Sequence, residues 1–309
     1  MRNRHDLIEI SQYHGLYGSI RCPIFALQYL VIDMETTAVK AGAYTHHLQF
    51  LSPAPEELAR FYGRLMDMTV SRLGEQWMCR GPGRRILFAE GPAKSVGYMA
   101  MACRDRDGLD SIRDRATRSG IEISKSSSSL LTEGFAVCDP VGNVMLFGLA
   151  DQEEPMQGIR GPLQHFNIRA ESVEAIEEFY VGKLGFAVSD RVRDSSGGLT
   201  TSFMRSNHEH HTLGCFRAAV RAFDHHSYEA GEWIVIRDWC DHFAKHDVQV
   251  MWGPGRHGPG NNLFVFIVDP DGNWIEVSAE LEVMLDRPLR EWPHGERTLN
   301  LWGKAILRS

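Results

Sequence analysis

Hydrophobic positions follow the same order of periods in two distant stretches of the chain, residues 45–71 and 163–189. Each stretch begins with alternating apolar and polar residues, which predicts a strand, and continues with apolar residues at three- and four-residue spacing, which predicts a helix. A second strand-like run follows in both. At a constant offset the stretches share a histidine, a Phe-Tyr pair and a closing Val-Ser pair, which are His47 with His165, Phe61-Tyr62 with Phe179-Tyr180, and Val70-Ser71 with Val188-Ser189. The chain therefore contains an internal repeat.

Each copy of the repeat also ends in the same turn signal. The sequence Asp-Pro-x-Gly-Asn occurs at 139–143 and 269–273 between two apolar runs, which predicts a β-hairpin in each copy. Helix-like spacing recurs between the shared signals, near residues 109–118 and 233–246, and Ser172 is placed to cap the first helix of the second copy. Together these signals predict an α+β fold of two tandem βαβββ modules.

The repeat divides the chain into five segments. The first 33 residues show no clear period and Met34 opens an ordinary start, so we hypothesise that residues 1–33 precede the natural start; the intact mass of the natural protein tests this. The tail is interpreted as a packing and assembly segment. The predicted segments are an N-terminal extension (1–42), a structural module (43–150), a polar linker (151–162), a catalytic module (163–280) and a C-terminal tail (281–309).

Composition and charge restrict the class of function. The 309 residues are 43% hydrophobic and 24% charged, which is typical of a globular chain with ample core. The net charge of -7, without a basic run, argues against nucleic acid as a partner. The apolar run at 23–32 is about half as long as a membrane span needs. Six cysteines without CxxC spacing indicate free thiols in a reducing compartment, so we expect a cytoplasmic protein that binds a small molecule and no membrane.

Candidate chemistry is found where the two copies differ. Glu276 lies in a strand-like run after the second turn signal, where the first copy has Leu146. His165 opens a strand-like run, and His226 lies in another, FDHHSYE (223–229), where neighbouring residues point to opposite faces. We predict that His165, His226 and Glu276 converge in the second module as a metal site of two imidazoles and one carboxylate. Such a set suits non-haem Fe(II), and zinc or manganese could take the same ligands.

These residues together make the chain resemble the type I extradiol ring-cleavage dioxygenases of the vicinal oxygen chelate (glyoxalase–bleomycin resistance) superfamily. The resemblance covers nearly the whole chain from about residue 43 and is densest in QHFNI, NHEHHTLGCF, FDHHSYE and GPGRHGPGNNLFVFIVDPDGNWIE. In that family the metal lies in the C-terminal module and the N-terminal module is structural. The resemblance implies that His165, His226 and Glu276 bind Fe(II), with Mn(II) as the alternative, and that a catechol-like aromatic molecule and O2 are the substrates.

The resemblance also implies roles for residues around the metal. His211 matches the family's acid-base histidine, His257 matches a histidine that hydrogen-bonds bound substrate or oxygen, and Asn167 matches a residue of the oxygen pocket. Phe266 stands where the family has a tyrosine that hydrogen-bonds the ionised catechol oxygen, and a phenyl ring cannot form this bond. We hypothesise that Tyr228 supplies the phenol instead, since it shares a strand face with His226. Unchanged kinetics of a Tyr228→Phe variant would reject this hypothesis.

Two other functions are alternatives on the same scaffold. A glyoxalase-like isomerase or lyase commonly takes its metal ligands from both modules, which Leu146 in place of a carboxylate disfavours. A non-enzymatic protein that binds aromatic molecules has little need for a full set of metal ligands and an acid-base histidine. We expect the extradiol dioxygenase, which cleaves the ring beside its two vicinal oxygens, in the form of a homo-oligomer.

Overall fold

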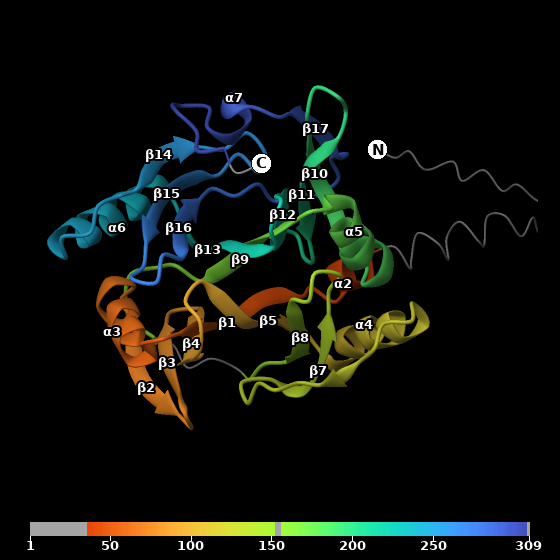
Figure 1. Cartoon of the computed structure of the whole chain (residues 1–309), viewed down its shortest axis with the longest axis horizontal. Helices are drawn as coiled ribbons and strands as arrows, with labels where there is room; N and C mark the ends of the chain where they lie inside the picture. Colours follow the sequence, from red (N-terminus) through yellow and green to blue (C-terminus); the bar gives the residue numbers. More distant parts are fainter. Residues whose placement is uncertain (1–35, 152–155, 308–309) are drawn as a thin grey trace, which may run out of the picture.

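Two mixed sheets, of eight and nine strands, form the body of the molecule (Figure 1). The computed structural model describes residues 36–151 and 156–307, so the hypothesis on residues 1–33 lies outside the described residues. The sheets meet where strand β1 of the first lies beside strand β9 of the second, and the longer helices lie on the outside (Figure 1). The predicted α+β class is confirmed.

The first sheet is built within residues 44–149 and has the strand order β2-β3-β4-β1-β5-β8-β7-β6. The short helix α2 (Thr37–Lys40) precedes it. In chain order its elements are β1 (Tyr44–Ser52), α3 (Pro55–Leu65), β2 (Thr69–Leu73), β3 (Gln76–Gly81), β4 (Arg84–Glu90), β5 (Ser95–Cys103), α4 (Arg106–Arg118), β6 (Ser124–Lys125), β7 (Thr132–Cys138) and β8 (Val144–Leu149).

The second sheet has the order β14-β15-β16-β13-β9-β12-β11-β10-β17. Helix α5 (Val173–Glu177) continues into the wider π-type turn η1 (Glu178–Lys183), and α7 (Glu296–Leu299) lies in the tail. The other elements are β9 (Leu163–Ala170), β10 (Ala187–Arg193), β11 (Leu199–Arg205), β12 (Leu213–Arg217), β13 (Ala222–Gly231), α6 (Trp233–Lys245), β14 (Trp252–Arg256), β15 (Leu263–Val268), β16 (Trp274–Ala279) and β17 (Arg290–Pro293).

Each half of the chain contains the βαβββ order twice, where the sequence predicts it once. The helices near 109–118 and 233–246 are present as α4 and α6, and each follows a strand that opens a second unit. In both sheets the first strand pairs parallel with the last strand of its own unit and antiparallel with the first strand of the next unit. This common pairing allows the two halves to be compared position by position.

The predicted turn and cap signals form for identifiable reasons. Asp139 Oδ1 and Asp269 Oδ1 accept hydrogen bonds from the backbone N–H of Asn143 and Asn273, both at 2.8 Å. The glycine of each turn has φ of 85°, a conformation that favours glycine. Ser172 Oγ accepts a backbone hydrogen bond at the start of α5 and caps it. Both predicted hairpins and the predicted cap are therefore present.

The two repeated signals bind each other across the sheets. Tyr62 Oη, from the Phe-Tyr pair of the first half, donates to Asp269 Oδ2 in the second turn at 3.2 Å. Tyr180 Oη, from the equivalent pair, donates to Asp139 Oδ2 in the first turn at 3.4 Å. Burial, aided by the facing aspartate, raises the pKa of both tyrosines well above the usual value, so both phenols remain donors. The contact between the halves is therefore reciprocal.

Arg84 joins the first half, the linker and the second half. It is fully buried, and its guanidinium donates to the carbonyl oxygens of Met66 at 2.9 Å, Ile159 at 2.9 Å and Gly161 at 3.2 Å. Its charged end also stands over the ring of Trp239 on α6, 5.3 Å from the ring centroid. The predicted polar linker is consequently bound to the first half at this point, and the same arginine contacts the second half.

The predicted tail packs on the second sheet. β17 pairs in parallel with β10, and Trp292 packs against the small cluster of Val192, Phe203 and Phe216. Of the remaining expectations from composition, the five cysteines in the described residues are all free. No helix within residues 36–151 and 156–307 is long and apolar enough to span a membrane.

Candidate metal and substrate site

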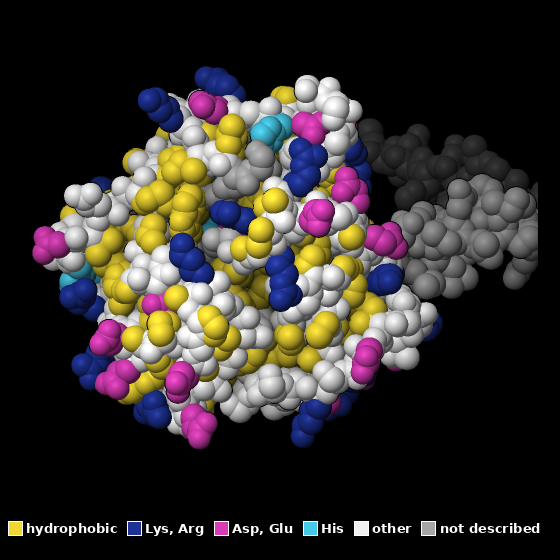
Figure 2. Space-filling view, in the orientation of Figure 1, with side chains coloured by type: hydrophobic (Ala, Val, Ile, Leu, Met, Phe, Trp, Pro, Cys, Tyr) yellow, Lys and Arg dark blue, Asp and Glu magenta, His cyan; other side chains and the backbone are white. Residues whose placement is uncertain are grey.

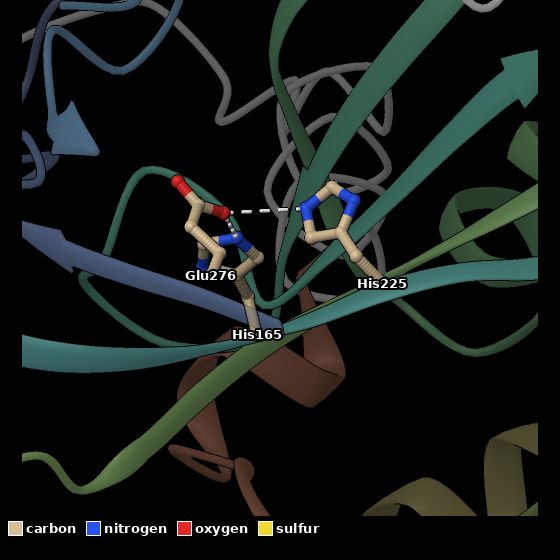
Figure 3. Close-up of side chains that lie close together, drawn as sticks. All are labelled: His165, His225 and Glu276. Atoms are coloured by element: carbon tan, nitrogen blue, oxygen red, sulfur yellow. Dashed lines mark hydrogen bonds and ion pairs between the residues drawn. The ribbon is translucent and has the colours of Figure 1, made fainter. Parts of the chain in front are cut away.

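Three strands of the second sheet bring two histidines and a glutamate together. His165 on β9, His225 on β13 and Glu276 on β16 point toward one another (Figure 3), and one ligand atom of each lies within 4.8 Å of the others. Nε2 of His165 lies 3.1 Å, and Nε2 of His225 lies 3.3 Å, from Oε2 of Glu276. All three side chains are buried. Two imidazoles and one carboxylate on neighbouring strands form a donor set for a divalent transition metal.

The ring of His225 is held with one nitrogen free for a ligand. Its Nδ1 lies 2.5 Å from Asp224 Oδ1, and because a carboxylate only accepts, Nδ1 carries the hydrogen. Its Nε2 therefore has a lone pair, and this nitrogen lies 3.0 Å from the amide nitrogen of Asn167, which donates to it. Arg169 Nε in turn donates to Asp224 Oδ2 at 2.5 Å. A carboxylate behind a histidine that fixes its tautomer is common around metal ligands.

Glu276 is a buried carboxylate that faces three histidine side chains. Its Oε1 accepts from Asn262 Nδ2 at 3.2 Å and lies 3.6 Å from His257 Nε2. Burial alone would raise the pKa of Glu276, but its contacts with His165, His225 and His257 outweigh burial and hold the pKa well below its usual value. Among the described residues no lysine or arginine forms an ion pair with it. A buried anion requires a compensating charge, so these residues fit a bound metal ion.

The structure corrects the second predicted histidine from His226 to His225. His226 points to the opposite face of β13, into the contact between the two sheets. Its ring centroid lies 5.0 Å from that of Phe50 and 6.0 Å from that of Tyr62, both in the first half. Burial lowers the pKa of His226 to about 3, so it is a neutral packing residue.

The hypothesis that Tyr228 contacts the substrate is wrong for the same reason. Tyr228 is fully buried, and its ring lies 5.3 Å from that of His226 on the face between the sheets, away from the candidate ligands. The alternation of the strand contained the signal, because Tyr228 and Ala230 mark the even positions as core. His225 and Glu229 lie at the odd, more polar positions. Applying the polar-face argument used for His165 to this strand would have selected His225.

A small, partly enclosed cavity lies over the three candidate ligands. Among the described residues that line it there is no lysine or arginine. Figure 2 shows lysine, arginine and acidic side chains interspersed over one face of the molecule, without a large patch of one sign. Beyond the ligands, the cavity is lined by the apolar residues Phe203, Phe216, Pro259 and Leu299 and by the polar residues Asn167, His211, His257 and Asn262.

The two other predicted histidines both line this cavity. The ring centroid of His211 lies 4.2 Å from that of His165, and burial lowers the pKa of His211 well below its usual value, so its ring is neutral. His257 Nδ1 donates to the carbonyl oxygen of Leu299 at 2.5 Å, which turns its Nε2 toward Glu276. Each histidine thus presents one ring nitrogen near the candidate ligands.

Phe266 lies behind the ligands and is not among the residues that line the cavity. It is fully buried, pairs with Glu276 across β15 and β16, and stacks on Trp252 at 5.2 Å between centroids. The rings of Phe266 and His225 pack edge to face, with their centroids 5.2 Å apart. Phe266 therefore supports a candidate ligand, while the predicted residue Asn167 is at the cavity itself.

The first sheet shows what the same positions hold without this chemistry. By strand register, Tyr98 occupies the position of His225, and Leu146 occupies that of Glu276. Tyr98 and Leu146 belong to a small apolar cluster that fills the space. His47, the counterpart of the first ligand, is buried without a metal-binding neighbour set among the described residues. The predicted loss of the carboxylate from the first half agrees with this arrangement.

Residues 163–277 match the Glyoxalase/Bleomycin resistance protein/Dioxygenase superfamily. The chain is 25% identical over 248 residues to metapyrocatechase 2 of Cupriavidus necator, which covers 71% of this chain and 75% of that protein. It is 23% identical over 142 residues to the manganese-dependent 2,3-dihydroxybiphenyl 1,2-dioxygenase of Geobacillus genomosp. 3, over 43% and 45% of the two chains.

Among solved structures, homoprotocatechuate 2,3-dioxygenase from Arthrobacter globiformis aligns with a TM-score of 0.74 at 20% identity. The alignment covers 85% of this chain and 88% of that one. At this identity the likeness shows a shared fold.

Proposed function

We propose that the protein, whose residues 163–277 match the Glyoxalase/Bleomycin resistance protein/Dioxygenase superfamily, is an extradiol dioxygenase that opens the ring of a small catechol with O2. The observation that carries this proposal is the convergence of His165, His225 and Glu276 at one side of a buried cavity with apolar walls. Relatives named as a metapyrocatechase and as a dihydroxybiphenyl dioxygenase support the same chemistry.

His165, His225 and Glu276 would hold a divalent metal, for which we propose Fe(II). Three protein donors on one side leave room on the other for a chelating substrate and O2. A bound metal would supply the template for both substrates and the electron transfer between them. Mn(II) accepts the same donors, and one relative carries manganese dependence in its name, so it is the alternative metal.

The surrounding side chains would bind the catechol and move its protons. Phe203 and Phe216 offer flat apolar faces for the ring and exclude water from the cavity. His211 is neutral and buried, so it can accept a hydroxyl proton and later return it. His257 presents Nε2 on the same side as Glu276, where it can hydrogen-bond a substrate oxygen. In the balanced reaction both atoms of O2 enter the substrate, and one ring bond beside the two hydroxyl-bearing carbons breaks.

The test is O2 uptake by protein loaded anaerobically with Fe(II) or Mn(II) and supplied with catechol, 3-methylcatechol or 2,3-dihydroxybiphenyl. We expect one O2 consumed per yellow ring-opened product. Replacement His211→Phe should lower kcat by about 10²- to 10⁴-fold, the usual contribution of a positioned acid-base group, with bound metal unchanged. Absence of uptake with all three catechols and both metals would reject the dioxygenase and favour the isomerase alternative.

The lining of the cavity also predicts a preference for uncharged catechols. A substrate carboxylate would enter a buried space whose described lining offers no lysine or arginine, next to Glu276. Burial of an unpaired charge is unfavourable, so we expect kcat/KM for 3,4-dihydroxyphenylacetate to be about 100-fold or more below that for 3-methylcatechol. Competition between the two substrates in one assay measures this ratio. Equal kcat/KM values for the two substrates would show that a cationic side chain reaches the substrate carboxylate.

A further inference from the structure

A buried row of polar side chains extends from His211 away from the cavity. Nδ1 of His211 lies 3.0 Å from Nδ1 of His210, and Nε2 of His210 lies 3.0 Å from Oδ2 of Asp190 on β10. His210 and Asp190 are fully buried, and neither lines the cavity. The row therefore connects a cavity residue to the edge of the second sheet without contact with a substrate.

The positions of the hydrogens in this row follow from the acceptors. Asp190 Oδ2 lies 3.0 Å from Nε2 of His210, off the direct line of a hydrogen bond, and because a carboxylate only accepts, we infer that this nitrogen carries a hydrogen. Nδ1 of a neutral His210 is then an acceptor, so the one hydrogen between the two Nδ1 atoms belongs to His211. The second ring nitrogen of His211, Nε2, points away from His210 and keeps a lone pair. A general base needs that lone pair on the substrate side.

Asp190 is itself held by the C-terminal tail. Its Oδ2 accepts from Trp292 Nε1 at 2.8 Å, and its Oδ1 accepts from Arg287 Nη1 at 2.9 Å. Burial would raise the pKa of Asp190, but the contacts with His210, Trp292 and Arg287 outweigh it and lower the pKa, so the carboxylate is ionised. The parallel pairing of β17 with β10 places the indole beside this carboxylate.

We propose that His210 and Asp190 are positioning residues that fix His211 in the tautomer with a free Nε2, and that the tail supports this pair through Trp292. The use of His211 as a base rests on the proposed function, whereas its tautomer does not. The tail then has a role in orienting a cavity histidine in addition to packing.

The tautomer is measured directly by 15N NMR of metal-free wild-type protein with labelled histidine, because protonated and bare ring nitrogens give separate signals. His211→Phe and His210→Phe variants assign the two residues. We expect hydrogen on Nδ1 of His211 and on Nε2 of His210. A His211 with hydrogen on Nε2, or a His210 with hydrogen on both nitrogens, overturns the proposal.

The kinetic test is His210→Phe, which keeps a ring against Phe203 but offers no acceptor to His211. We expect kcat to fall about 10- to 100-fold, the usual effect of losing a residue that orients a site, with KM and bound metal unchanged. In His210→Asn, Oδ1 lies as many bonds from Cα as Nδ1 does and can accept the same hydrogen bond, so most of kcat should return. Wild-type kcat in the Phe variant, or no recovery in the Asn variant, contradicts the proposal.

Two further variants complete the design. His208 is exposed in the same loop, so His208→Phe should leave kcat unchanged and controls for the loss of a nearby histidine. Trp292→Phe removes one donor to Asp190 at a half-buried position, and it should lower kcat at constant KM even where His210→Phe does not fold. Unchanged kcat in this variant rejects the role of the tail. If the NMR result is as expected but no catechol is turned over, the proposed function is rejected and the proposed tautomer of His211 stands.

Discussion

Replacement of His225 by alanine is expected to abolish metal binding and ring cleavage, whereas replacement of its neighbour His226 should leave the metal bound. His225 supplies one of three donors, and its loss leaves only His165 and Glu276. His226 lies on the other face of the strand, so His226→Ala should instead lower the free energy of unfolding by about 2 to 4 kcal/mol through the space it leaves in the core. Elemental analysis and urea unfolding of both variants measure the two effects.

His226→Phe is the matched control for this pair of variants. A phenyl ring refills the volume between the two sheets without offering a metal donor, so we expect metal content like that of the wild type and a smaller loss of stability than in His226→Ala. If His226→Ala lost the metal while His225→Ala kept it, the strand register that places His225 at the site would be wrong.

The second large effect is expected from Arg84→Met. The methionine fills much of the space but donates nothing to the carbonyl oxygens of Met66, Ile159 and Gly161, which would be left buried without a partner. We expect the free energy of unfolding to fall by about 3 to 5 kcal/mol, because each unsatisfied buried acceptor costs about 1 to 3 kcal/mol and the acceptors relax in part. Urea unfolding followed by far-ultraviolet circular dichroism measures the change.

Arg60→Met provides the comparison at an exposed arginine. Its side chain is 74% exposed and pairs with Glu56 one turn earlier on α3, an interaction worth at most about 1 kcal/mol at the surface. Arg84→Lys should fall between the two Met variants, since an ammonium keeps the charge but reaches fewer carbonyls. A loss of less than about 1 kcal/mol in Arg84→Met would show that the linker is held by other contacts.

Local signals in the sequence predicted much of the fold. The Asp-Pro-x-Gly-Asn turns and the Ser172 cap depend on residues within five positions of each other, so the local sequence is enough to predict them. The doubled βαβββ order within each half was missed, because the two units of one half share no motif as plain as the one that links the halves. The pairing of β17 with β10 joins residues about 100 positions apart, which no periodicity reveals.

The candidate site was predicted in its residue types and in two of its three proposed ligands. His165 and Glu276 were found because each strand has a clear polar face, and His225 was missed because order along the chain was used in place of that face. The contacts that orient the side chains of the site could not be predicted from the sequence. The hydrogen bond of His257 to the Leu299 carbonyl and the contact of His210 with Asp190 depend on tertiary packing.

The reciprocal bonds of Tyr62 with Asp269 and of Tyr180 with Asp139 set a condition on hybrid proteins. Each half gives a tyrosine to the other and receives one in return, so a half moved into a foreign chain needs a host that matches both contacts. The turn that Tyr62 holds leads into the strand of Glu276. A transplanted second half would carry every proposed metal donor and still present the carboxylate poorly until its host supplied that tyrosine.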